Sequence, residues 1–235
     1  MRIVRSPKDF LAGLLFIAVG VAAIALASGY TLGSAARMGP GYFPRILGIS
    51  EDFILFIAES GIVTPDTPIV EKCLETAGIV GELFERAVTT GEIGMAELFD
   101  ENYRPLNGTD PPQHMTRFVK LTDRLLPDVQ EPLLGFDPRI TFCAAVDRNG
   151  YLPTHNKIYS NPQGSDPVWN SANCRNRRIF SDRTGLAAGR STRRFLLQTY
   201  RRDMGGGNFV LMKDVSAPIT VLGRHWGGFR IGFRL

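Results

Sequence analysis

ITFCAAVDRNGYLPTH, residues 140–155, is the clearest structural signal in this chain. Its first seven residues form the short apolar run typical of a buried strand. The tetrapeptide DRNG at 147–150 is a strong turn signal between two extended segments. The stretch therefore predicts a β-hairpin. Further strands with breaking residues between them are predicted at 194–202, 208–216 and 226–234.

The chain before this run has helical rather than strand-like periodicity. Apolar residues recur at three- and four-residue spacing from Ile69 to Ala87, which marks one buried face of a helix. Shorter helices are predicted at 51–60, 95–99 and 115–129. A connecting excursion at 160–191 shows no strand pattern and is expected to hold one short helix near Trp169. The order of these elements is helices first, then a hairpin, the excursion and three more strands. This order predicts an α+β fold with an antiparallel five-stranded sheet.

Charge divides the chain into two halves. Residues 51–137 hold 17 acidic and 6 basic residues, whereas residues 138–235 hold 5 acidic and 16 basic residues. The simplest interpretation is that the two stretches face each other within one domain or across a dimer. The basic half could also bind nucleic acid. Its arginines are scattered between apolar strand residues and no nucleic-acid motif is present, so we expect no such partner.

An apolar segment precedes the expected domain. Residues 10–27 run for 18 residues without a charge and follow three basic residues, close to the roughly 20 residues that cross a bilayer core. They predict a transmembrane helix and a single-pass protein of the bacterial inner membrane, with the side of the folded domain undecided. A signal peptide, suggested by the A-x-A pattern at 25–27, and a buried core helix are the alternatives.

Residues that carry chemistry are sparse. The three cysteines contain no CxxC pair, and the three histidines are not at zinc-ligand spacing from any of them. No G-x-S-x-G, H-E-x-x-H or workable cysteine–histidine arrangement occurs. We therefore expect no catalytic residues, no metal site and no enzyme activity.

Polar side chains near the predicted strand ends are candidates to line a ligand pocket. Arg178 and Arg194 can grip a carboxylate through two parallel hydrogen bonds, unless they pair internally with Asp182 or Asp203. His155 can form a hydrogen bond with a ligand or with the local backbone. It could also ligate haem, the one cofactor that the sequence allows us to expect. The full set of ligand candidates is His155, Asn156, Arg178, Asp182, Arg194, Tyr200, Asp203 and His225.

Four ordered motifs resemble one protein family. They are DRNGYLPTHN at 147–156, NCRNRRIF at 173–180, RRDMGGG at 201–207 and GRHWGG at 223–228. Through them, residues 51–235 resemble the C-terminal Cache-like sensory domain of one group of bacterial methyl-accepting chemotaxis proteins. The resemblance implies a PAS/Cache-like sheet and a small-molecule site between that sheet and the excursion at 160–191. We expect an organic anion as one candidate ligand, and a homodimer.

The first part of the chain resembles a different family. The sequence MGPGYFP at 38–44, after the apolar segment, is similar to the start of the small membrane subunit of tripartite tricarboxylate transporters. The expected domains are therefore a membrane segment at 1–49 and a sensory domain at 50–235, helical to residue 138 and sheet-forming from 139. The expected function is small-molecule sensing of the chemoreceptor type, without the methyl-accepting signalling coil. The alternatives are a transporter subunit and a non-functional fusion of the two.

Overall fold

The computed structural model describes residues 63–204 and 207–235, which all belong to one compact unit. Predictions for residues 1–62 fall outside the described residues. These predictions are the transmembrane helix at 10–27, the MGPGYFP loop and the helix at 51–60.

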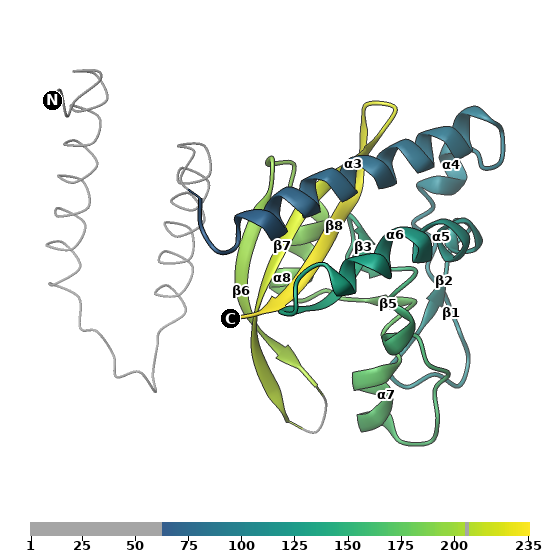
Figure 1. The fold of residues 1–235 in the computed structure, drawn as a ribbon. Helices are drawn as coiled ribbons and strands as arrows, with labels where there is room; N and C mark the ends of the chain where they lie inside the picture. The colour runs from purple at the N-terminus through teal and green to yellow at the C-terminus, as the bar shows by residue number, and fades with distance from the viewer. Residues whose placement is uncertain (1–62, 205–206) are drawn as a thin grey trace, which may run out of the picture. The chain divides into compact units, whose positions relative to one another are not determined.

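A four-stranded antiparallel sheet forms the centre of the described unit (Figure 1). Its spatial order is β3-β8-β7-β6. The last three strands form a meander, and β3 joins it by pairing with β8, so that Cys143 lies opposite Ile231. The strands are β3 (Ile140–Asp147), β6 (Leu196–Asp203), β7 (Phe209–Val221) and β8 (Arg224–Arg234).

The predicted five-stranded sheet is wrong, because the second arm of the expected hairpin leaves the sheet. The turn itself forms: Oδ1 of Asp147 accepts the backbone N–H groups of Asn149 and Tyr151. The strand β4 (Tyr151–Leu152) then pairs with β5 (Arg178–Ile179) instead of with β3. Pro153 follows at once and has no N–H to extend a ladder.

At the outer edge of β3, a backbone N–H group forms its hydrogen bond with a side chain rather than with a neighbouring strand. Oδ1 of Asn156 accepts the N–H of Cys143 at 2.7 Å. This bond replaces one rung of the hairpin that the sequence predicted. A second pair of short strands, β1 (Arg104–Pro105) and β2 (His114–Met115), lies apart from the main sheet.

Helix α3 (Thr67–Thr89) covers one face of the sheet and confirms the periodicity of its apolar residues (Figure 1). Its side chains of Cys73, Val80 and Phe84 are completely buried. Phe84 meets the indole of Trp226 edge-on, with ring centroids 5.0 Å apart. Trp226 also donates its Nε1–H to the carbonyl of Leu98 at 2.9 Å, which links β8 to the helical layer.

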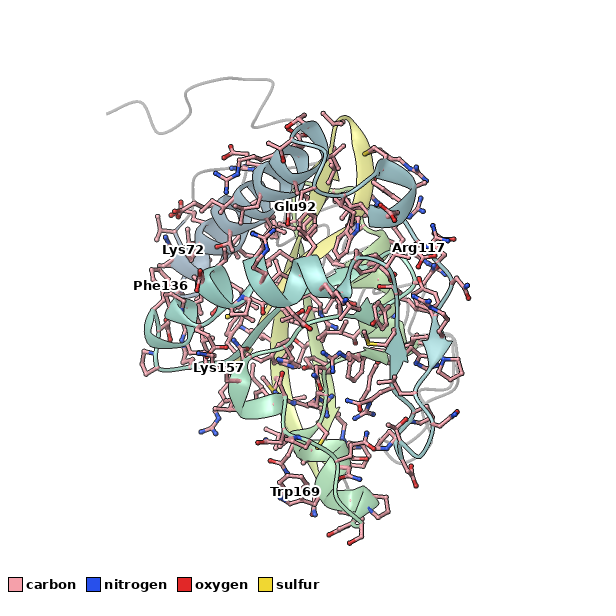
Figure 2. The ribbon with its side chains drawn as sticks, turned by 90° about the vertical axis from the view of Figure 1, so that its right-hand side faces the viewer. Lys72, Glu92, Arg117, Phe136, Lys157 and Trp169 are labelled. Carbon is pink, nitrogen blue, oxygen red and sulfur yellow. The ribbon has the colours of Figure 1, made fainter. Side chains whose placement is uncertain are left out.

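Shorter helices continue this layer beside α3 (Figure 2). The ammonium of Lys72 on α3 lies 5.4 Å from the ring centroid of Phe136, which follows the last of them. The remaining helical elements of this layer are α4 (Met95–Leu98), α5 (Val119–Leu125), α6 (Pro127–Gln130) and the 3-10 helix η1 (Pro132–Gly135).

The opposite face of the sheet carries the excursion, which contains more structure than predicted. Helix α8 (Arg183–Arg190) begins at Asp182, whose Oδ1 accepts the N–H groups of Thr184 and Gly185. Gly189 lets this helix approach β3, because a Cβ there would lie 2.2 Å from the carbonyl oxygen of Asp147. The excursion also contains η2 (Lys157–Tyr159) and α7 (Pro167–Asn173).

Strand β7 is longer than predicted and runs through Pro218, which we expected to interrupt it. Strand β6 pairs with β7 only as far as Ser216, so Pro218 lies where β7 has one neighbour. Proline is tolerated in sheets at such edges. The turn to β8 places Leu222 and Gly223 at positive φ (48° and 75°), as a two-residue hairpin turn requires.

Ion pairs join the acidic and basic stretches of the chain. Arg139 bonds Asp66 at 2.8 Å, and Arg177 bonds Asp123 at 2.8 Å. These contacts lie within one unit, in agreement with the simplest interpretation of the divided charge.

The predicted single-pass membrane architecture needs correction. Across residues 63–204 and 207–235, every helix is too short or too polar to traverse a bilayer. The segment at 10–27, on which that prediction depended, lies outside the described residues.

Candidate functional site

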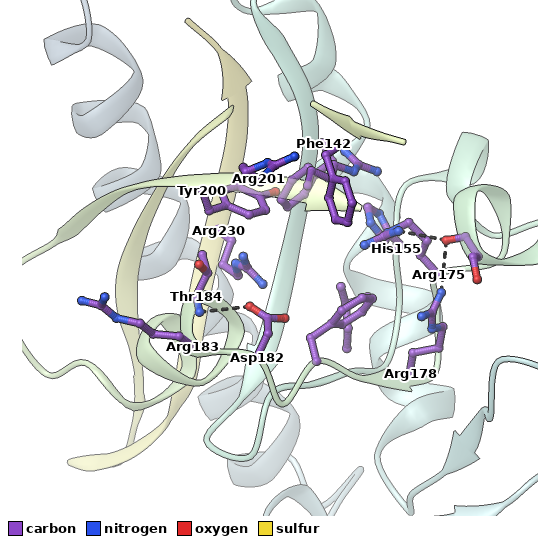
Figure 3. Close-up of a pocket in the computed structure, with 15 residues that line it drawn as sticks. Phe142, His155, Arg175, Arg178, Asp182, Arg183, Thr184, Tyr200, Arg201 and Arg230 are labelled. Carbon is purple, nitrogen blue, oxygen red and sulfur yellow. Dashed lines mark hydrogen bonds between the residues drawn. The ribbon is translucent and has the colours of Figure 1, made fainter. Parts of the chain in front are cut away.

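A cavity of about 540 Å³ lies on the sheet face opposite α3 (Figure 3). It is bounded by residues of β3, β6, β7 and β8, by Leu152 and His155, and by the excursion. Its lining residues are Phe142, Leu152, His155, Ser171, Arg175, Arg178, Phe180, Asp182, Arg183, Thr184, Tyr200, Arg201, Arg202, Phe209 and Arg230.

Strand alternation explains which residues of β3 and β8 reach the cavity, because successive side chains point to opposite faces. Phe142 on β3 and Arg230 on β8 line the cavity. Their neighbours Cys143, Phe229 and Ile231 belong instead to the apolar core under α3. The sheet thus separates an apolar core from a polar site.

Positive charge dominates the cavity. Six arginines line it, and Asp182 is the one acidic residue among the lining residues. Asp182 is already engaged as the N-cap of α8. The cavity is therefore suited to an anion rather than to a cation or a neutral apolar molecule.

Arg202 is the most unusual of these arginines. It is only 2% exposed, and none of its three guanidinium nitrogens has a hydrogen-bond partner among the described residues. Its guanidinium carbon lies 4.9 Å from the ring centroid of Phe142 and 4.5 Å from that of Tyr159. Each such contact contributes about 0.5–2 kcal/mol. A buried charge without hydrogen bonds costs several kcal/mol, so the two rings offset only a part of the cost.

Arg230, in contrast, has an internal counterion. Its Nε and Nη2 donate to the carboxylate of Asp214, with Nη2–Oδ2 at 2.8 Å, and both side chains are buried. Burial raises the pKa of Asp214, and the adjacent guanidinium opposes that rise. Asp214 thus neutralises one of the charges that face the cavity.

Arg175 and Arg178 form the part of the cavity wall contributed by the excursion. The Nη1 atoms of both donate to the carbonyl of Ser171, at 2.9 and 3.2 Å. Both guanidinium groups also lie over the ring of Phe180, at 5.0 and 5.2 Å. Desolvation, followed by the charges of Arg202 and Arg178, lowers the pKa of Arg175 to about 9. The wall is therefore a site of accumulated positive charge.

His155 lies in the cavity wall as a neutral side chain. Burial, followed by the charges of Arg175, Arg202 and Arg230, lowers its pKa well below the usual range. Its Nδ1 accepts the N–H of Asn156 at 2.7 Å. The proton of the neutral ring therefore resides on Nε2, which makes His155 a hydrogen-bond donor there. Haem ligation by His155 stays an untested prediction.

The structure brings together half of the predicted site residues. His155, Arg178, Asp182 and Tyr200 all line the cavity. Three of the other four do not. Asn156 is completely buried against the edge of β3, Arg194 is exposed ahead of β6, and His225 lies at the start of β8. The side chain of Asp203, at the end of β6, lies outside the described part of the chain.

Sequence reasoning missed the arginines that dominate the cavity. From the sequence, the arginines of the basic half were described only as scattered between apolar strand residues, and none of Arg175, Arg202 and Arg230 was named as a ligand candidate. One signal was available: Arg230 stands between Phe229 and Ile231, and arginine within an apolar strand is seldom buried without a partner.

Within residues 63–204 and 207–235, no cluster of three His, Cys, Asp or Glu side chains is placed to hold a metal ion. Comparison with models of protein families and with curated proteins found no match.

Proposed function

We propose that residues 63–235 act as a sensory domain that binds a small organic anion, in a signal transduction protein of the chemoreceptor type. The observation that carries the proposal is Arg202, a buried guanidinium without hydrogen-bond partners among the described residues, in the wall of a cationic cavity. A carboxylate is the natural partner of such a group, because it accepts two parallel hydrogen bonds and compensates the buried charge.

The size of the cavity supports a metabolite-sized ligand. Its volume of about 540 Å³ lies within the roughly 300–1,000 Å³ typical of small-molecule sites. Aromatic rings of Phe142, Phe180 and Tyr200 supply apolar contacts beside the arginines. This combination of a partly apolar wall and a few strong donors is typical of ligand pockets.

The motifs that resemble the chemotaxis family supply much of this cavity. The motif at 173–180 contributes Arg175 and Arg178, and the motif at 201–207 contributes Arg201 and Arg202. The motif at 147–156 contributes Leu152 and His155. The cavity also lies between the sheet and the excursion, where that resemblance implies a ligand site.

The test is a thermal-shift screen of the full chain against small carboxylates, with each hit measured by titration calorimetry. A ligand at 100 times its dissociation constant should add about 2.7 kcal/mol to the free energy of unfolding. We expect Arg202→Met to weaken binding of the hit at least tenfold, since charge-assisted hydrogen bonds contribute about 1.5–3 kcal/mol.

Arg194→Met is the matched control, because Arg194 is exposed and is not among the lining residues. It should leave the dissociation constant unchanged. A screen in which no carboxylate stabilises a cooperatively melting chain would overturn the proposal. Equal loss of affinity in both variants would also do so, because it would indicate general charge attraction rather than the cavity.

A further inference from the structure

We infer that the ligand carries an acceptor oxygen on the carbon next to its carboxylate, so that the domain binds 2-oxo and 2-hydroxy acids and rejects 2-amino acids. Arg202 holds the carboxylate, and the Nε2–H group of His155 donates to the neighbouring oxygen. This inference rests on the proposed function, and it names the ligand class and a second residue that selects it.

His155 and Arg202 pack against the same two aromatic rings. The guanidinium carbon of Arg202 lies 4.9 Å from the ring centroid of Phe142 and 4.5 Å from that of Tyr159. The imidazole centroid of His155 lies 5.6 Å from the ring centroid of Phe142 and 5.0 Å from that of Tyr159. Both polar side chains line the cavity. They therefore lie close together in one part of its wall, where one small molecule can reach both.

Close packing fixes these side chains in place. His155 is 4% exposed, Phe142 is 5% exposed and Arg202 is 2% exposed. Figure 3 shows His155 beside Phe142, which belongs to β3 of the main sheet. Side chains that are already held in one arrangement lose little further freedom when a ligand binds. The imidazole and the guanidinium are thus preorganised for binding.

The hydrogen bond at Nδ1 determines which nitrogen of His155 can reach a ligand. Nδ1 accepts the backbone N–H of Asn156 at 2.7 Å, so the proton of the ring resides on Nε2. Asn156 is itself fixed, because its Oδ1 accepts the N–H of Cys143. Within the described part of the chain, no group accepts a hydrogen bond from Nε2. His155 therefore presents a neutral donor to the cavity, beside the buried cation of Arg202.

Two unlike donors select the group next to the carboxylate. Arg202 supplies a charged fork that matches a carboxylate, whereas the single N–H of His155 needs one acceptor atom. A ketone or hydroxyl oxygen on carbon 2 meets this need, and a methylene group does not.

A 2-amino acid is excluded by the same two groups. Its ammonium has no lone pair, so it would face the N–H of His155 and the charge of Arg202 without an acceptor. Asp182, the one acidic side chain among the described lining residues, already accepts the N–H groups of Thr184 and Gly185.

The test compares acids that share a carbon skeleton and differ at carbon 2, on the full chain by titration calorimetry. One set is pyruvate, lactate, propionate and alanine. The second set is phenylpyruvate, phenyllactate, 3-phenylpropionate and phenylalanine. One neutral hydrogen bond contributes a factor of about 2–12 in affinity, so the better of the 2-oxo and 2-hydroxy acids should bind at least about threefold more tightly than the unsubstituted acid. The amino acid should bind at least about tenfold more weakly than that acid.

Variants of His155 locate the donor. His155→Leu removes the N–H and should abolish the preference for an oxygen on carbon 2, while the affinity for the unsubstituted acid stays nearly unchanged. His155→Gln keeps an N–H group near the position of Nε2 and should retain a part of the preference. His225→Gln is the matched control, because His225 is not among the lining residues, and it should change neither affinity.

A measurement on the unaltered chain covers the case in which His155→Leu fails to fold. The chain has three histidines, so long-range proton–nitrogen NMR spectra of their imidazole groups are simple, and His155→Gln assigns the signals. The Nε2–H proton of His155 should move downfield when the 2-oxo or 2-hydroxy acid is bound. It should move less with the unsubstituted acid.

Each outcome has a distinct meaning. Equal affinity for the substituted and unsubstituted acids, or tighter binding of the amino acid, would overturn the inference and leave the proposed anion site standing. An Nε2–H signal that does not respond, or a preference that His155→Leu leaves intact, would overturn the role of His155. Failure of both sets beside a hit among other carboxylates would overturn the inference alone. Failure of every carboxylate would overturn the proposed function itself.

Discussion

Arg230 and Asp214 form a buried ion pair between β8 and β7, on the face of the sheet that lines the cavity. The Nε of Arg230 lies 3.2 and 3.1 Å from the two carboxylate oxygens, and Nη2 lies 2.8 Å from Oδ2. Asp214 is completely buried and Arg230 is 5% exposed. Neither charge can be removed from this place without leaving the other uncompensated.

We therefore expect Asp214→Asn to lower the free energy of unfolding by about 3–5 kcal/mol, the usual cost of breaking a buried pair. Urea denaturation of the two chains measures the difference. The double variant Asp214→Leu with Arg230→Met removes both charges and should be more stable than Asp214→Asn. A loss below about 1 kcal/mol for Asp214→Asn would mean that Arg230 finds another counterion.

Arg202 leads to the opposite prediction for stability. Arg202→Met removes a buried guanidinium without hydrogen bonds and keeps a flexible apolar chain beside Phe142 and Tyr159. We expect the ligand-free variant to melt a few degrees higher than the unaltered chain, a gain of about 1–2 kcal/mol. Differential scanning calorimetry measures this. A lower melting temperature would show that the ring contacts dominate and that Arg202 stabilises the fold.

Asp147 should make stability depend on pH. Burial raises its pKa from the usual 3.8 to about 6. The folded chain therefore favours the protonated carboxyl. This contribution to stability is fully present below about pH 4 and is lost as the pH rises through 6. The shift of roughly two pKa units corresponds to about 3 kcal/mol.

Asp147→Asn should remove this dependence and keep the local hydrogen bonds. Its amide oxygen can still accept the N–H groups of Asn149 and Tyr151, and its NH₂ group can donate to the hydroxyl of Tyr103. The variant should gain stability relative to the unaltered chain between pH 4 and pH 7, measured by urea denaturation across that range. A difference that does not change with pH would contradict the raised pKa.

Two helical glycines provide a matched pair of substitutions. Gly189→Ala should destabilise the chain by several kcal/mol, because its Cβ would lie 2.2 Å from the backbone oxygen of Asp147. Gly78→Ala on α3 meets no atom within 4 Å and should stabilise by about 0.4–1 kcal/mol through the lower entropy of the unfolded chain. Thermal melting of both variants is the measurement. Similar changes in stability for the two variants would show that close packing of α8 against β3 does not require glycine at position 189.

Sequence pattern predicted α3 and the strands β3, β6, β7 and β8, because each has a long run of regular apolar spacing. It failed at β4, where the turn formed by DRNG is real but the strand that follows pairs with β5. The choice of partner depends on Pro153 and on the Asn156 side chain at the edge of β3, which local pattern does not report. Helix α8 was missed because its sequence, RTGLAAGR, contains two glycines and offers little helix propensity.

Only a part of the candidate site was predicted, because local sequence pattern does not report how the strands pair. His155, Arg178, Asp182 and Tyr200 were found because they stand at ends of predicted elements. Arg202 and Arg230 lie within strands, and their role depends on which face of the sheet each strand presents to the excursion. That face becomes apparent only when β3 is paired with β8 and α3 occupies the other side.

The pairing of β3 with β8 also has a consequence for biosynthesis. During translation, β3 leaves the ribosome well before β8, the strand that supplies its neighbour in the sheet. Until that neighbour emerges, β3 has no partner strand in the sheet. Helix α3 has already been synthesised and can cover the apolar residues on one face of β3. Such non-local pairing slows folding and leaves strand edges open to aggregation. Nascent chains that stop short of β8 should therefore depend on chaperones, and completion of β8 should release them.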